Sequence, residues 1–238
     1  MKDSGYDAIS IGDGKDFTSD WNARAKKYGA LEISSFGTDS YKKFAEFFGY
    51  VLAQRIINHL KIDKSDTILD LGCGPGKITK HIIGVCKKII AVDGSDVMLA
   101  EAKKVIYPKS KIQYYQKIED LSGIKNDMID KAFSYAVFIH LPEDVQYSYI
   151  SEIIRVLKPG GIALIHVRYK QKLERYIRTF SGVSFNESRL KNLMKKYPGC
   201  EFEFLKLRGD EDLSDLKYRR FLLLKKIRNK KVLKSLIW

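Results

Sequence analysis

The chain contains the run Ile68-Leu69-Asp70-Leu71-Gly72-Cys73-Gly74-Pro75-Gly76-Lys77, in which apolar residues lead to a carboxylate and then to three closely spaced glycines. This order is typical of a buried strand that ends in a turn and opens onto a helix. A second apolar run, Lys88 to Val92, ends at Asp93. A carboxylate about 20 residues after such glycines, at the end of a parallel strand, is positioned to accept both hydroxyls of a ribose. The two runs together predict a nucleoside site at the edge of a parallel sheet.

The spacing of the glycines indicates which nucleoside is bound. Gly72, Gly74 and Gly76 give G-x-G-x-G, whereas the dinucleotide fingerprint is G-x-G-x-x-G. Asp70, just ahead of the turn, would repel a pyrophosphate, but it would attract the ammonium and the sulfonium of S-adenosylmethionine (SAM). The run resembles the first motif of the class I SAM-dependent methyltransferases.

The resemblance implies a role for several residues. The methionine end of SAM would be wrapped by Asp70, Gly72, Cys73, Gly74 and Gly76, and the ribose would be held by Asp93. In the segment that follows, Gly94 and Met98 would lie at the cofactor, with Met98 against the adenine. The segment that reads the adenine edge resembles Gln116 to Leu121, with the Ile118 backbone N–H as a donor. The family usually has an acid and then a small residue there, where this chain has Lys117 and Ile118, so Glu119 or Asp120 would have to supply the side-chain contact.

The order of the elements predicts an α/β fold. Apolar runs at 67–71, 88–93, 112–115, roughly 131–138 and 162–167 alternate with helical patterns, which implies a parallel sheet with helices on both faces. The runs 201–205 and 218–224 have no helix between them and predict an antiparallel hairpin at one edge. Class I methyltransferases end in this way, so the resemblance implies a Rossmann-like, seven-stranded, mostly parallel sheet with an antiparallel last strand.

We expect a core at 61–225, preceded by an N-terminal helical cap at 1–60 and followed by a basic tail at 226–238. The stretch from Phe17 to Ala25 loosely resembles a segment that folds over the cofactor in small-molecule methyltransferases. In that interpretation Arg24 pairs with the methionine carboxylate and Tyr28 closes the pocket. The alternative is an ordinary surface helix anchored by Trp21.

The candidate catalytic residues follow strand four. His140 would act as a general base for a hydroxyl acceptor, or else bond a loop as a structural histidine. Tyr135 would lie beside the cofactor and orient the acceptor. His166, at the end of strand five, is a candidate substrate ligand, although a structural role is favoured for it. A predicted insertion at 168–183 carries Tyr169, Arg175 and Arg178, which either bind an anionic acceptor as part of a lid or form a solvated basic face.

Composition limits the partners. The formal net charge of +14 over 238 residues indicates an anionic partner or a lysine-rich solvated surface. The three cysteines, Cys73, Cys86 and Cys200, suggest neither a disulfide framework nor a metal site, which favours a cytoplasmic protein. No apolar run has the length of a membrane span, and the first residues do not resemble a secretory signal. A monomer and a homodimer both remain open.

These observations predict a SAM-dependent methyltransferase that leaves S-adenosylhomocysteine. The expected acceptor is a small metabolite that is anionic or phosphorylated, and a sugar-linked metabolite is one form of it. The methyl group is expected on an oxygen atom of this acceptor. One alternative is a tRNA or rRNA methyltransferase that uses the basic segments, although no RNA-binding module is visible. Another is a SAM-binding partner protein without turnover, against which the intact glycine turn, Asp70 and Asp93 argue. Aminopropyl transfer is disfavoured because polycationic acceptors do not suit so basic a chain.

Overall fold

The computed structural model describes residues 21–23, 25–26, 39–116, 120–168, 185–205 and 219–228. Seven strands form one sheet: β1 (Thr67–Leu71), β2 (Lys88–Asp93), β3 (Ile112–Gln116), β4 (Ile129–Ser134), β5 (Leu157–Arg168), β6 (Cys200–Leu205) and β7 (Arg219–Lys226). The helices are α3 (Asp39–Leu60), α4 (Thr79–Ile82), α5 (Asp96–Val105), α6 (Glu143–Val156) and α7 (Glu187–Met194), with short 3-10 turns η1 (Lys109–Lys111) and η2 (Phe138–His140).

The strand order is β3-β2-β1-β4-β5-β7-β6. Strands β1 to β5 pair in parallel, whereas β7 is antiparallel to both β5 and β6. The predicted mostly parallel sheet with a reversed seventh strand is therefore confirmed. The order reverses between β1 and β4, which is the point where open α/β sheets bind their ligands.

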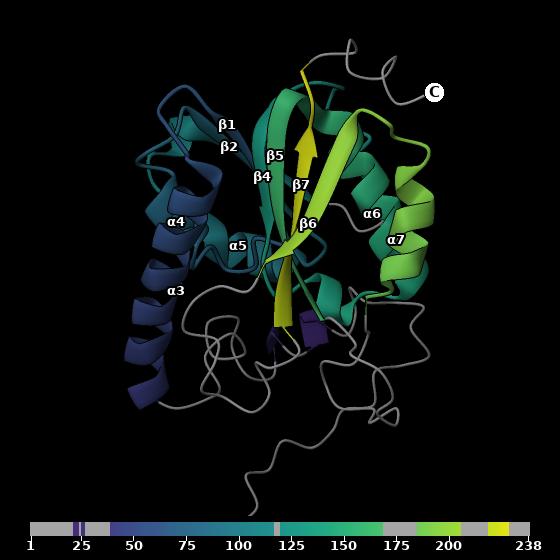
Figure 1. The fold of residues 1–238 in the computed structure, drawn as a ribbon. Coiled ribbons are helices and arrows are strands. Elements are labelled where there is room, and N and C mark those ends of the chain that lie inside the picture. Colours follow the sequence, from purple (N-terminus) through teal and green to yellow (C-terminus); the bar gives the residue numbers. More distant parts are fainter. Residues whose placement is uncertain are drawn as a thin grey trace, which may run out of the picture.

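Alternation along the strands builds two cores, one on each face of the sheet. On β1 and β2, Leu69, Leu71 and Ile90 face one core, which α6 and α7 cover with residues such as Ile150 and Leu190. The intervening residues face the second core, which contains Ile56 of α3, Ile82 of α4 and Leu99 of α5. Figure 1 shows α3 and α4 on one side of the sheet and α6 and α7 on the other.

Helix α3 packs unusually close to the loop that follows β1. A Cβ atom added at Gly49 would lie 2.9 Å from the backbone carbonyl oxygen of Lys77, and Gly49 is buried. The absence of a side chain at this position therefore lets α3 approach the glycine turn.

The fourth strand ends earlier than its apolar pattern predicts. It covers Ile129–Ser134, whereas the prediction was roughly 131–138. The chain leaves the strand because Ala136 takes a left-handed conformation, with φ of 58°, and Phe138 then enters the 3-10 turn η2. Phe138 is still buried, since the turn inserts its ring into the core under α6. An apolar run can thus be continuous in burial without being continuous in secondary structure.

Candidate functional site

The glycine turn after β1 is fitted tightly on two sides and open on the third. Gly72 has φ of 79°, and a Cβ there would lie 2.1 Å from the Val137 Cγ2 atom. Gly76 has φ of 83°, and its Cβ would lie 2.7 Å from Ile106 Cδ1. A Cβ at Gly74 would meet no described atom within 4 Å. The turn therefore presents its free side at Gly74, where a ligand can approach the backbone.

Neighbouring strands hold this turn in place. The backbone N–H groups of Gly72 and Cys73 both donate to the carbonyl oxygen of Val92, at 2.7 and 3.0 Å. On the other side, the buried hydroxyl of Ser134 donates to the carbonyl oxygen of Leu71 at 2.8 Å. The turn is thus tied to β2 and to β4, so its backbone is preorganised before any ligand arrives.

Asp93 lies beside the turn at the end of β2. Its carboxylate accepts hydrogen bonds from the backbone N–H of Gly74, at 2.8 Å, and of Ser95, at 2.9 Å. Burial raises the pKa of the Asp93 carboxyl, while these backbone donors oppose the shift. Each carboxylate oxygen has a second lone pair, so both oxygens can still accept a bond from a vicinal diol.

Asp70, the penultimate residue of β1, is 2% exposed and accepts a hydrogen bond from the Thr79 hydroxyl. Burial raises the pKa of the Asp70 carboxyl to about 7, and the negative charge of Asp93 adds to the effect. A cation bound nearby would favour the ionised carboxylate. The two acids therefore suit a ligand that carries positive charge at one end and a ribose at the other.

The adjoining helix α5 begins beside the same site. Its N-cap is Ser95, whose hydroxyl accepts a hydrogen bond from the backbone N–H of Met98 at 3.1 Å and donates one to the side-chain oxygen of Asn22. Met98 is buried and packs with Ala25 and Trp21. Trp21, Asn22 and Ala25 of the amino-terminal segment thus contact the start of α5.

His140 and Tyr135 follow β4 at this end of the sheet. The His140 ring meets the Trp21 ring edge to face, with centroids 5.3 Å apart. Its turn is held by the buried side chain of Gln146, whose Nε2 donates to the carbonyl oxygens of Phe138, at 2.7 Å, and Leu141, at 3.0 Å. Trp21 therefore connects the amino-terminal segment with the candidate base.

Tyr135, just after β4, belongs to a cluster of rings with residues of β5, β7 and α3. It lies parallel to the His166 ring at 4.8 Å, and it meets Phe221 at 6.2 Å and Phe48 at 6.3 Å. His166 is 1% exposed, and its Nδ1 accepts from the Ala136 backbone N–H at 3.2 Å. This bond supports the left-handed backbone at Ala136, which is the structural role that the sequence favours for His166.

The structure describes only part of the predicted site. It brings together Asp70, Gly72, Gly74, Asp93 and Met98, with Cys73, Gly76 and Gly94 in the same two loops. The Cys73 thiol is buried, which raises its pKa well above the ordinary value, and it contacts the Gly74 carbonyl oxygen at 3.5 Å. The remaining candidates lie outside the described residues, namely Arg24, Tyr28, Ile118, Glu119, Tyr169, Arg175 and Arg178.

Three residues that position the site have no signal in the sequence. Thr79, Ser134 and Val137 contact Asp70, Leu71 and Gly72 respectively, and the first two do so through hydroxyls that any exposed helix or strand could carry. Their partners are 9 to 65 residues away in the sequence, so only the folded chain reveals the pairing. Val137 could be recognised only as one apolar residue among several.

The fold and the two acids around an open glycine turn define a Rossmann-like nucleoside-binding domain of the class I methyltransferase type. Residues 69–165 match the family model described as a methyltransferase domain. The match to this model and the methyltransferase relatives support the class I SAM-dependent methyltransferase family, with SAM as the cofactor of this domain. The described residues fit that cofactor, because Gly74 leaves room for it, Asp93 keeps lone pairs for the ribose and Asp70 offers a carboxylate to its cationic end.

Individual proteins agree with this assignment. The chain is 31% identical over 130 residues to a methyltransferase, 235L, of Invertebrate iridescent virus 6, which covers 52% of this chain and 46% of the relative. It is 27% identical to trans-aconitate 2-methyltransferase of Azoarcus sp. strain BH72, over 63% of this chain and 58% of the relative. The chain spans about half the length of these curated relatives.

A solved structure has the same fold. The complex of DhpI with S-adenosylhomocysteine superposes with a TM-score of 0.58 at 17% identity, covering 89% of this chain and 96% of that one. Within the part of the chain that the structure describes, no helix is both long and apolar enough for a membrane span.

Proposed function

We propose that this chain transfers the methyl group of SAM to an oxygen of a small, anionic acceptor, such as an organic acid or a phosphorylated, sugar-linked metabolite. The observation that carries the methyl-transfer part is the arrangement of Asp70 and Asp93 around the open side of the glycine turn at Gly74. A cofactor held in this way would direct its sulfonium toward the carboxyl ends of β4 and β5, where ligands of such sheets bind.

Two findings support the anionic acceptor. The chain carries a net charge of +14, which favours negatively charged partners. One of its relatives bears the name trans-aconitate 2-methyltransferase, and trans-aconitate is a small organic acid. An ionised carboxylate or phosphate oxygen is already a nucleophile, so for such an acceptor the protein needs mainly to align the oxygen, the methyl carbon and the sulfur.

In the proposed reaction an acceptor oxygen attacks the methyl carbon while the bond from that carbon to sulfur breaks. The bonding pair stays on sulfur, which leaves neutral S-adenosylhomocysteine. When the acceptor is a hydroxyl, its proton goes to a base, and His140 is the proposed one. The contact between Trp21 and His140, and that between Ala25 and Met98, support a role for the amino-terminal segment as a cap over both substrates.

The test begins with calorimetric titrations of SAM and S-adenosylhomocysteine, followed by product detection with panels of organic acids, sugar phosphates and bulk tRNA. Formation of S-adenosylhomocysteine together with a methylated acid or phosphate would support the proposal. Methylated tRNA, with an affinity that falls steeply with salt, would replace it with the RNA alternative. Tight SAM binding without turnover on any panel would favour the non-catalytic partner.

The role of His140 has its own test once an acceptor is known. His140→Gln should lower kcat by about 100-fold for a hydroxyl acceptor and abolish the acidic limb of the pH profile. His59→Gln is the matched control, because His59 is exposed at the end of α3 and bonds only the Arg55 carbonyl oxygen among the contacts described for it. An unchanged pH profile in His140→Gln would remove His140 from the mechanism.

A further inference from the structure

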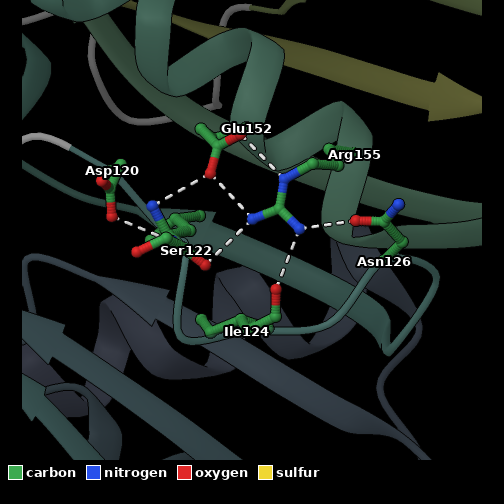
Figure 2. A network of polar contacts seen from close by, with 7 residues as sticks. Asp120, Ser122, Ile124, Asn126, Glu152 and Arg155 are labelled. Carbon is green, nitrogen blue, oxygen red and sulfur yellow. Dashed lines mark hydrogen bonds and ion pairs between the residues drawn. The ribbon is translucent and has the colours of Figure 1, made fainter.

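The guanidinium of Arg155, near the end of α6, lies at the centre of a network of polar contacts with the loop between β3 and β4 (Figure 2). Its Nη1 donates to the carbonyl oxygen of Ile124, at 2.9 Å, and to Oδ1 of Asn126, at 2.7 Å. Its Nη2 donates to the carbonyl oxygen of Leu121 at 2.9 Å. Nε and Nη2 together hold the two carboxylate oxygens of Glu152, each at 2.8 Å. All five N–H donors of an arginine are thus used.

Glu152 completes the attachment from the other side. Its Oε2 atom also accepts a hydrogen bond from the backbone N–H of Leu121 at 3.0 Å. The backbone N–H of Leu121 is therefore bound by Glu152, and its carbonyl oxygen by Arg155. Leu121 and Ile124 are almost fully buried. A Cβ added at Gly123 would lie 3.0 Å from Cε1 of the Tyr115 ring on β3. The loop therefore rests on β3 and is fastened to α6.

The loop begins at the nucleoside end of the site, after β3, and its described part reaches the Arg155 network before β4 begins. The glycine turn follows β1 and Asp93 ends β2, so a cofactor that runs from its cationic end to its ribose runs from β1 toward β2. Its base must then continue toward β3, the next strand in the sheet. Gln116, the last residue of β3, is paired with Asp93, and Leu121 follows Gln116 by only five positions.

We propose that Arg155 and Glu152 are positioning residues for the adenine end of the cofactor. They would not touch the cofactor, but they hold residues 121–126 of the loop, whose chain leaves the nucleoside end of the site at Gln116. The planar guanidinium suits this task because its fork binds two carbonyl groups and a carboxylate at fixed angles, which an ammonium cannot do. The proposal rests on SAM as the cofactor and is independent of the acceptor.

The experiment compares Arg155→Lys and Arg155→Met with the wild type in calorimetric titrations of SAM and of 5′-methylthioadenosine, which lacks the methionine end. Both ligands should bind about tenfold more weakly to each variant, and by the same factor, because the loop that loses its Arg155 contacts would serve the adenosine, which the two ligands share. Thermal unfolding and the binding stoichiometry report the fraction of folded protein in each variant. A change in affinity can therefore be distinguished from a loss of folded protein.

Arg189→Met is the matched control. Arg189 also bonds α6, through Glu143 and Asp144, but it has no described contact with the loop. Its removal should leave both affinities unchanged. Should Arg155→Met fail to fold, Arg155→Lys and Glu152→Gln carry the test.

Two results would overturn the proposal. One is unchanged affinity for both ligands in folded Arg155 variants, which would leave the network a purely structural role. The other is weaker binding of SAM with unchanged binding of 5′-methylthioadenosine, which would place the effect at the methionine end. Failure of the wild type to bind SAM would instead contradict the cofactor assignment, so the two failures are distinguishable.

Discussion

The carboxylate of Asp93 and the backbone N–H of Gly74 are joined by a hydrogen bond of 2.8 Å, which links the end of β2 to the turn that follows β1. The acid is therefore part of the scaffold of the site as well as a candidate ligand for the ribose. This bond also explains why the turn stays open at Gly74, because Asp93 fixes the N–H and no side chain of the described residues fills the space.

Asp93→Ala should weaken SAM binding by about 1–3 kcal/mol, since it removes the ribose acceptor and leaves the Gly74 and Ser95 N–H groups without their partner. Calorimetry with SAM and S-adenosylhomocysteine measures the loss, which should be similar for both ligands. Glu203→Gln is the control, because Glu203 is an exposed acid on β6 that pairs with Lys225. Equal affinities of the wild type and Asp93→Ala would contradict the assignment of Asp93 to the ribose.

Alanine substitutions in the glycine turn should separate folding from binding. Gly72→Ala should cost about 3 kcal/mol or more of unfolding free energy, because the left-handed backbone is strained and the new Cβ meets Val137. Gly74→Ala should cost only about 1 kcal/mol, since its Cβ meets no described atom, yet it should reduce SAM affinity. Chemical denaturation and SAM titration measure the two effects.

Gly84→Ala serves as the reference for these variants. No described atom lies within 4 Å of its Cβ position, and its change in stability should stay within about 0.5 kcal/mol. If Gly74→Ala bound SAM like the wild type, the open side of the turn would not be the cofactor site.

SAM affinity should rise with pH up to about 7. The pKa of Asp70 is raised to about 7 in the ligand-free fold, while the cationic cofactor favours the carboxylate, so binding below pH 7 releases a proton. As the pH rises toward 7, the dissociation constant should therefore fall by up to about tenfold for each pH unit. Above pH 7 it should level off. Titrations in buffers of different ionisation enthalpy count the proton released.

The same shift makes the ligand-free protein less stable as pH rises. The unfolded Asp70 loses its proton near its ordinary value of 3.8, before the folded one does, so its contribution to the unfolding free energy declines between about pH 4 and pH 7. Asp70→Asn should flatten both dependences, leaving the contributions of the other carboxyls whose pKa burial raises, such as Asp93. A dependence that survives unchanged in Asp70→Asn would assign it to another group.

Lys226→Met should destabilise the fold by about 1–2 kcal/mol. The Lys226 ammonium donates to the carbonyl oxygens of Ile154 and Leu157, at 2.9 and 2.7 Å, at the end of α6, and it pairs with Asp127. Lys225→Met removes only an exposed ion pair with Glu203 and should change stability by at most about 0.5 kcal/mol. Thermal unfolding of the two neighbouring variants compares them directly, and equal shifts would contradict the role of Lys226.

Local patterns determined much of the fold. The strands at 67–71 and 88–93 were predicted to the residue, because apolar runs and glycine turns act within a few positions of the chain. The antiparallel arrangement of the last two strands followed from the absence of a helix between them. The pattern failed at the end of β4, where Ala136, which is not a glycine, takes a left-handed backbone conformation and interrupts the apolar run.

The sequence by itself therefore determined the class of fold, the glycine turn and its two acids, since these depend on short-range spacing. Only the tertiary structure decided that Val137 closes over Gly72, that Thr79 bonds Asp70 and that Arg155 reaches back 31 and 34 positions to Ile124 and Leu121. Such contacts join elements whose approach is set by the packing of whole helices against the sheet. The local sequence does not reveal these contacts, because the same residue types are equally common on an exposed surface.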